Sequence, residues 1–209
     1  MIYPAINEVY RKELLRFLLL KTAAVRSGIK PGELLRIQHC YKSKNPEGFQ
    51  FCLYKHDILS IMKLDFIELK VDHNSSLVLF FHAGNMQKTL TNPAKLAVLA
   101  ECGYHITGDY RCLLAKLQER FKQNPLPHEV GVFIGYPAKD VVGFINNLPR
   151  TPVHKGLWAV FGDAKESVHC MNTYRKAEQI AQHLLDMCDD LQTYFDLLNK
   201  YTSNREFAL

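Results

Sequence analysis

The segment PHEVGVFIGYPAKDVVGF, residues 127–144, decides the fold that we expect. Its uninterrupted apolar run, residues 130–134, predicts a strand that is buried on both faces. Gly135, Tyr136 and Pro137 then form a tight turn, and Pro137 suits the first position of a helix. The segment therefore predicts a strand, a turn and a helix, with Lys139 in the first helical turn.

A second segment, WAVFGDAKESVHC at residues 158–170, repeats this order of an apolar run, a glycine and then Ala-Lys-acid. We interpret the two segments as successive βα units whose strands end at one sheet edge, if they are parallel and adjacent. Two helix N-termini would meet there, with free N–H groups and a positive dipole end that favour anions. The predicted ligand-binding residues are Gly135, Tyr136, Lys139, Gly162, Asp163 and Lys165, with Arg150, His154 and Lys155 from the connection between the units.

A structural interpretation of the same turns stays open. Pro137 and Asp163 are ordinary residues for helix initiation, and the Asp163 carboxylate would repel an anion. The glycine-rich dinucleotide fingerprint and the P-loop motif are both missing from the sequence. The turns therefore predict either a site for a small anionic or nucleotide-like ligand or fold elements alone, and the cofactor is unknown.

Catalysis is the alternative to simple binding. The acid–base candidates are His128 with Glu129, or Tyr136 with Asp140. His128 and Glu129 do not form the H-E-x-x-H motif, because Val132 stands where the second histidine would be. A strand of about six residues, at about 3.3 Å each, would also separate His128 from Tyr136 by about 20 Å. We therefore favour a non-catalytic binding or adaptor protein, which recognises a small anionic or nucleotide-like ligand or a protein partner, over an enzyme.

The rest of the chain predicts a mixed α/β (α+β) fold with a four- to five-stranded mixed sheet and helices on both faces. Residues 65–71 and 76–82 read as strands. Residues 4–26, 49–62 and 109–123 read as helices, and the short apolar segment at 33–37 also reads as a helix. We expect a single α/β domain over residues 1–182 and a helical C-terminal extension over 183–209.

A long final helix is expected from Asp163 to about Tyr201. Its apolar residues recur in steps of three and four, as in a heptad seam, at Tyr174, Ala177, Ala181, Leu184, Cys188, Leu191, Phe195 and Leu198. At 1.5 Å per residue this helix would be about 58 Å long, which exceeds the width of a domain of this size. The pattern predicts packing on the N-terminal helix or a homodimer, and a break within DMCDD, residues 186–190, is equally open.

Composition limits the partners. The 209 residues are 47% hydrophobic and 22% charged, which is typical of a globular protein, and the net charge of +5 favours anionic ligands while making nucleic acid an unlikely partner. The six cysteines show neither a zinc pattern nor a disulfide framework, so we expect reduced thiols in the cytoplasm and no metal site. The apolar run LLRFLLL is far shorter than the roughly 20 residues of a membrane span, so no membrane association is expected.

Two segments, LPHEVGVFIGYPAKDVVGFI at residues 126–145 and GLWAVFGDAKES at 156–167, resemble the core of a bacterial family, domain of unknown function 3793. AAVRSGIKPGELL at 23–35 fits as well, and the resemblance covers roughly residues 15–180. The family is found mainly in anaerobic Gram-positive bacteria and carries no established activity to transfer. Its members commonly have His-Cys where this chain has Lys21 and Thr22, and a cysteine where it has Ala177. The resemblance implies that this chain lacks any thiol or metal site built from those positions.

Overall fold

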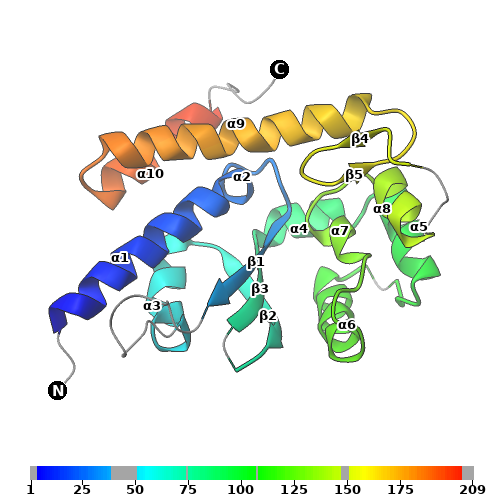
Figure 1. Ribbon diagram of the computed structural model, residues 1–209, viewed down its shortest axis with the longest axis horizontal. Coiled ribbons are helices and arrows are strands. Elements are labelled where there is room, and N and C mark those ends of the chain that lie inside the picture. The colour runs from blue at the N-terminus through cyan, green and yellow to red at the C-terminus, as the bar shows by residue number, and fades with distance from the viewer. Residues whose placement is uncertain (1–3, 39–50, 74, 107, 147–150, 204–209) are drawn as a thin grey trace.

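The computed structural model of the protein describes residues 4–38, 51–73, 75–106, 108–146 and 151–203 (Figure 1). The fold is mixed α/β, as the sequence predicts. The helices of the described residues are α1 (Pro4–Lys21), α2 (Ala23–Arg26), α3 (Phe51–Met62), α4 (Ala83–Thr89), α5 (Pro93–Glu101), α6 (Tyr110–Gln123), α7 (Val130–Phe133), α8 (Ala138–Ile145), α9 (Lys165–Met187) and α10 (Leu191–Ser203). The strands are β1 (Gly32–Gln38), β2 (Asp65–Val71), β3 (Ser75–Phe81), β4 (His154–Lys155) and β5 (Ala159–Val160).

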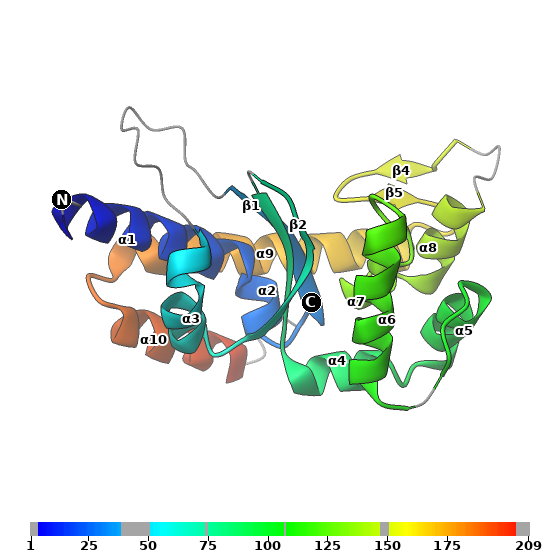
Figure 2. The same ribbon diagram turned by 90° about the horizontal axis from the view of Figure 1, so that it is seen from below.

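A three-stranded antiparallel sheet forms the centre, in the order β1-β3-β2. All seven residues of β3 are buried, which confirms the prediction from its continuous apolar run. Side chains alternate between the two faces of a strand. Leu77, Leu79 and Phe81 therefore pack on the side of α4 to α8, and Val78 and Phe80 on the side of α1, α3 and α10 (Figure 2).

The predicted four- to five-stranded mixed sheet is wrong. The central sheet has three strands, and β4 and β5 form a separate antiparallel hairpin in which His154 lies opposite Val160. Every strand pair of the described residues is antiparallel. The two βα units therefore do not share a parallel sheet edge.

The first unit fails because its apolar run is helical. Residues Val130–Phe133 form α7, and its amides bond locally, with Ile134 N donating to Val130 O at 3.2 Å. A short apolar run with buried neighbours on all sides is compatible with either a strand or a helix. Here the run is enclosed by the sheet, α5 and α8, which bury it without any strand pairing.

The segment at residues 33–37 is also corrected, from helix to strand. It forms β1, which pairs with β3 from Gly32 opposite Phe81 to Gln38 opposite Ser75. A β carbon on Gly32 would lie 2.9 Å from the carbonyl oxygen of Phe133, so this glycine lets β1 pass close to α7. Five residues are too few for a stable isolated helix, and the backbone of β3 offers a full hydrogen-bonding ladder instead.

Helix α9 crosses the whole molecule and joins its two halves (Figure 1). Near its start, Met171, Tyr174 and Ala177 pack with the hairpin, and near its end Leu184 and Leu185 join the core of α1 and α3. The heptad seam is thus used within the chain, as a wide apolar stripe usually is. The packing on the N-terminal helix is confirmed by the contacts of α9 with α1 and α2.

The alternative of a break within DMCDD is confirmed. α9 ends at Met187, Cys188 has extended backbone angles, and α10 begins at Leu191. The Asp190 carboxylate accepts from the amide of Thr193 at 2.9 Å, as an N-capping side chain does. Helix α10 then folds back, and its Tyr194 and Leu198 lie in the same core as Leu15 of α1.

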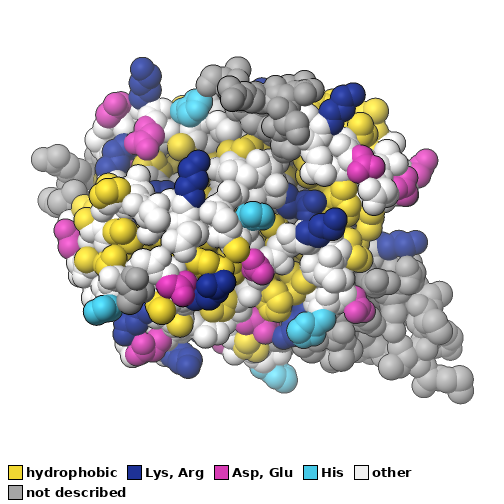
Figure 3. All heavy atoms as spheres, turned by 180° about the vertical axis from the view of Figure 1, so that it is seen from behind, with side chains coloured by type: hydrophobic (Ala, Val, Ile, Leu, Met, Phe, Trp, Pro, Cys, Tyr) yellow, Lys and Arg dark blue, Asp and Glu magenta, His cyan; other side chains and the backbone are white. Residues whose placement is uncertain are grey.

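The division at residue 183 and the homodimer both stay predictions. On the face shown in Figure 3 the hydrophobic side chains form several patches between charged ones rather than one continuous surface.

Within the described part of the chain, no helix is both long and apolar enough to cross a membrane.

Candidate functional site

Two of the predicted residues, Lys139 and Gly162, do come together. They line a cavity of about 600 Å³ between α5, α8 and the end of β5. The Lys139 ammonium donates to Asp140 Oδ1 at 2.8 Å, to Ser167 Oγ at 2.8 Å and to Phe161 O at 3.1 Å. An ammonium has three N–H donors, so none is left for a ligand. This cavity is otherwise lined mainly by small and apolar side chains and does not favour an anion.

The Asp140 carboxylate is the centre of a buried network. It is 2% exposed and accepts four hydrogen bonds, from Lys139, from Trp158 Nε1 at 2.8 Å, from Ser167 Oγ at 2.6 Å and from the amide of Phe161 at 2.9 Å. These bonds tie α8 to the hairpin and to the first turn of α9. Because all its lone-pair directions are used, Asp140 holds the fold together here and is not free to act as a catalytic base.

The network makes the free energy of unfolding depend on pH in the acidic range. Burial alone would raise the pKa of Asp140, but the hydrogen bonds from Lys139, Ser167, Phe161 and Trp158 outweigh it and hold the pKa below its ordinary value. The unfolded chain then binds the proton first, so this contribution is complete above about pH 4 and is lost as the pH falls further. We expect the difference in unfolding free energy between the wild type and Asp140→Asn to shrink between pH 5 and pH 2. Urea unfolding at several pH values measures it, and a constant difference would contradict the assignment.

The other predicted residues do not form a site with these. Asp163 and Lys165 are exposed, and the Asp163 carboxylate accepts from the amide of Lys165 at 3.0 Å. His154 and Lys155 are exposed on β4. Arg150 lies outside the described residues. Tyr136 lines a different cavity, and Gly135 before it lines neither.

His128 and Glu129 point in different directions. The exposed His128 ring lies edge-on to Phe144, with 4.8 Å between ring centroids. Glu129 is 2% exposed, forms an ion pair with Arg120 and accepts from the Tyr104 hydroxyl at 3.2 Å. The two side chains therefore do not act as a pair, and Glu129 is a satisfied internal carboxylate.

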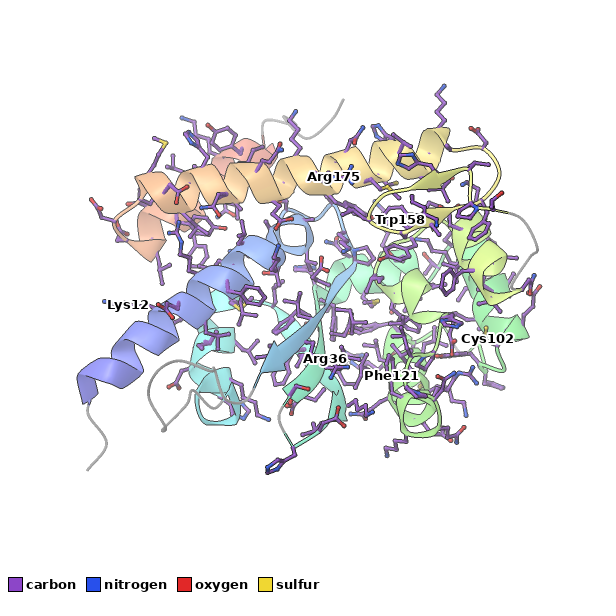
Figure 4. The ribbon with its side chains drawn as sticks, in the orientation of Figure 1. Lys12, Arg36, Cys102, Phe121, Trp158 and Arg175 are labelled. Carbon is purple, nitrogen blue, oxygen red and sulfur yellow. The ribbon has the colours of Figure 1, made fainter. Side chains whose placement is uncertain are left out.

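A polar cavity of about 240 Å³ lies where α1, α2, β1, the α7–α8 turn, the hairpin and α9 meet. We call it the anion pocket. Its lining residues are Leu20, Lys21, Ala24, Lys30, Glu33, Tyr136, Leu157, Trp158, Tyr174, Arg175 and Glu178. Figure 4 shows Trp158 from the hairpin below α9, which carries Arg175. Only Tyr136 of the predicted ligand residues lies here.

Aromatic rings form one wall of the anion pocket. Tyr136 and Trp158 stack with 4.3 Å between centroids and 23° between planes, and Tyr174 lies 6.2 Å from Trp158. The Trp158 indole is fixed by Asp140, and the Tyr174 hydroxyl donates to Gly135 O at 3.0 Å. Burial, with a smaller effect of the Glu33 carboxylate, raises the pKa of Tyr136 to about 12. The Tyr136 hydroxyl therefore stays protonated at neutral pH and can donate a hydrogen bond.

Charged side chains of both signs line the rest of the pocket, with three cations and two carboxylates. Lys30 is 6% exposed, and its ammonium lies 2.6 Å from Glu33 Oε2 and 5.2 Å from the Tyr174 ring centroid. Glu33 is its one hydrogen-bond acceptor among the residues that the structure describes, so two N–H donors lack a protein acceptor. Exposed Arg175 has no ion-pair or hydrogen-bond partner within the same ranges.

The sequence analysis missed Lys30, Trp158, Tyr174 and Arg175 as neighbours of Tyr136. Trp158 is the single tryptophan of the chain, which is a signal that we did not use. Lys30 stands beside a glycine and a proline that mark the start of β1. The convergence itself depends on α9 lying across the molecule, which no local pattern predicts.

The three positions at which the resemblance implies His-Cys and Cys in relatives, Lys21, Thr22 and Ala177, lie in or beside the lining of the anion pocket. Lys21 forms an ion pair with Glu178, the residue after Ala177. Thr22 and Ala177 are fully buried, and the Thr22 hydroxyl donates to Leu18 O at 2.7 Å. In the described part of the chain, no group of three or more His, Cys, Asp or Glu side chains is placed to hold a metal ion.

The fold and the pocket define a mixed α/β protein with a small, polar, aromatic-walled cavity. Neither a curated protein nor a solved structure matches the chain. The model of one family, described as Protein of unknown function (DUF3793), matches residues 18–194. The chain belongs to this family, as the resemblance indicates.

Proposed function

We propose that the protein is a non-catalytic binding protein that recognises a small anion in the anion pocket. The observation that carries the proposal is Lys30, a buried lysine that lines a cavity with two unused N–H donors. Burying an ammonium is costly unless its charge and donors find partners. An anionic ligand would supply the missing acceptors, and Arg175 and the Tyr136 hydroxyl add donors beside it.

The size of the pocket limits the ligand. Its volume of about 240 Å³ lies below the ~300–1,000 Å³ of common ligand pockets. A complete nucleotide is therefore less suitable than a small carboxylate or phosphate. We therefore propose a small anion as the ligand and not a nucleotide-like molecule. A cytoplasmic location stays a prediction from the cysteine pattern.

We do not propose an enzyme. His128 and Glu129 face apart, Asp140 has four hydrogen-bond donors around its carboxylate, and the pKa of Tyr136 lies at about 12. A general base needs a pKa near the working pH and a proton within reach. The occupied lone pairs of Asp140 and the raised pKa of Tyr136 make neither suitable, and His128 and Glu129 do not act as a pair.

Trp158 makes the test direct, since its fluorescence arises from the pocket wall alone. We expect saturable changes in emission with phosphate, acetate or benzoate, and affinities that fall as salt rises. Lys30→Ala should weaken binding about 10- to 100-fold, since a hydrogen bond to a charged group contributes about 1.5–3 kcal/mol. Arg175→Ala, at an exposed position that leaves the core intact, should weaken it several-fold.

Lys165→Ala is the matched control, because this lysine is exposed and lies outside the pocket lining. It should bind each anion as the wild type does. No response to any of the three anions, or equal losses in Lys165→Ala and Arg175→Ala, would refute the proposal.

A further inference from the structure

A second cavity, of about 280 Å³, shares Tyr136 and Trp158 with the anion pocket. We call it the apolar cleft. Apart from the shared pair, it is formed mainly by Leu34, Leu126, Val130, Ile134, Val141 and Phe144, from β1, α7, α8 and the segment before α7. The stacked rings of Tyr136 and Trp158 are thus a wall common to a charged cavity and an apolar one.

The apolar cleft offers little to a charged group. Two polar side chains line it: the Asp140 carboxylate is already surrounded by four donors, and the His128 ring packs edge-on against Phe144. At the rim, Leu126 is 48% and Phe144 51% exposed, so a bound apolar group would cover large side chains that water now contacts. The chemistry of the cleft therefore suits hydrocarbon or an aromatic ring.

Neither cavity alone reaches the ~300 Å³ at which common ligand pockets begin. One ligand that occupies both would have a normal size, with a charged end and an apolar end. Of the two rings between the cavities, Trp158 is fixed by its bond to Asp140. The Tyr136 hydroxyl has no hydrogen-bond partner among the described residues, so no hydrogen bond fixes this ring against a ligand.

The charge of the anion pocket selects the head group. Three cationic side chains line it, Lys21, Lys30 and Arg175, against the two carboxylates of Glu33 and Glu178. The excess is one positive charge, which matches one carboxylate better than a doubly charged phosphate. Two cations are already paired with the carboxylates, which leaves Arg175 and the spare donors of Lys30 for the ligand.

From this geometry we infer that the ligand is an amphipathic monocarboxylate. Its carboxylate binds to Lys30 and Arg175, and its short alkyl or aryl part lies in the apolar cleft. The inference rests on the proposed function, because it needs the anion pocket to bind an anion. It adds the second cavity and the apolar part of the ligand.

Isothermal titration calorimetry with acetate, octanoate and octanol tests it. Octanoate should bind about 50-fold more tightly than acetate, the ratio expected if about three methylene groups become buried. The double variant Leu126→Ala/Phe144→Ala should lose about tenfold of the octanoate affinity and keep the acetate affinity. Arg175→Ala should weaken both acids and leave octanol unaffected.

Val71→Ala/Met187→Ala is the matched control, since these side chains are 61% and 63% exposed and line neither cavity. It should bind octanoate normally. Equal affinities for acetate and octanoate would overturn this inference and leave the proposed function standing. Octanol binding as tightly as octanoate would also overturn it, and failure of both acids to bind would refute both proposals.

Discussion

Asp140→Ala is expected to lower the free energy of unfolding by about 3 kcal/mol, as the loss of one partner from a buried ion pair does. The substitution removes the acceptor for Lys139, Trp158, Ser167 and the amide of Phe161 at once. Lys139 is one-third exposed and can regain water, but Trp158 and Ser167 are buried and cannot. Each donor left without a partner costs about 1–3 kcal/mol.

Asp163→Ala provides the same chemical change in an exposed setting. Its carboxylate accepts only from the amide of Lys165 among the described residues, so we expect a loss of about 1 kcal/mol or less. Urea unfolding followed by circular dichroism gives both values. Similar losses in the two variants would mean that the Asp140 network does not hold the hairpin to α8 and α9.

Gly135→Ala is expected to cost about 2–4 kcal/mol, for two reasons that can be separated. Gly135 has a φ of +87°, which costs an alanine about 1 kcal/mol or more. An added β carbon would also lie 2.7 Å from Pro31 Cδ and 2.7 Å from the Tyr174 hydroxyl, which are held by β1 and α9. Overpacking of this kind adds about 1–3 kcal/mol.

Gly162→Ala measures the cost of the positive φ alone. Gly162 has a φ of +71°, and a β carbon there would meet no atom within 4 Å. We expect a loss of about 1 kcal/mol, so the two glycines of the repeated sequence pattern should differ clearly in urea unfolding. Equal losses would show that the approach of Pro31 and Tyr174 to Gly135 relaxes without cost.

The repeated sequence pattern shows which structural features a local sequence can predict. It located two turns whose glycines both have positive φ, and the structure brings Lys139 beside the second turn. It predicted both apolar runs before them as strands, which holds for the second, where Ala159–Val160 form β5, and fails for the first, which forms α7. Short buried runs fit a strand or a helix equally well. Whether such a run becomes a strand or a helix depends on the elements that pack around it, and the sequence of the run itself does not reveal them.

Elements with their own end signals were predicted well. Asp109 caps α6 by accepting from the amide of Arg111 at 2.9 Å, and the alternation in residues 65–71 and the continuous apolar run in 76–82 gave β2 and β3. The candidate site was predicted only in Tyr136. Lys139 carried the expected charge, but its donors are used internally, and a sequence cannot show which lysine keeps free donors.

The position of α9 has a consequence for how the chain folds during synthesis. Arg16 and Lys21 of the first helix pair with Asp186 and Glu178, which lie 170 and 157 residues later. The apolar face of α1 therefore has no final cover while the ribosome is still producing the middle of the protein. Contacts of such long range slow folding and leave intermediates exposed to aggregation. Nascent chains that stop before α9 should accordingly depend on chaperones until the last helices emerge.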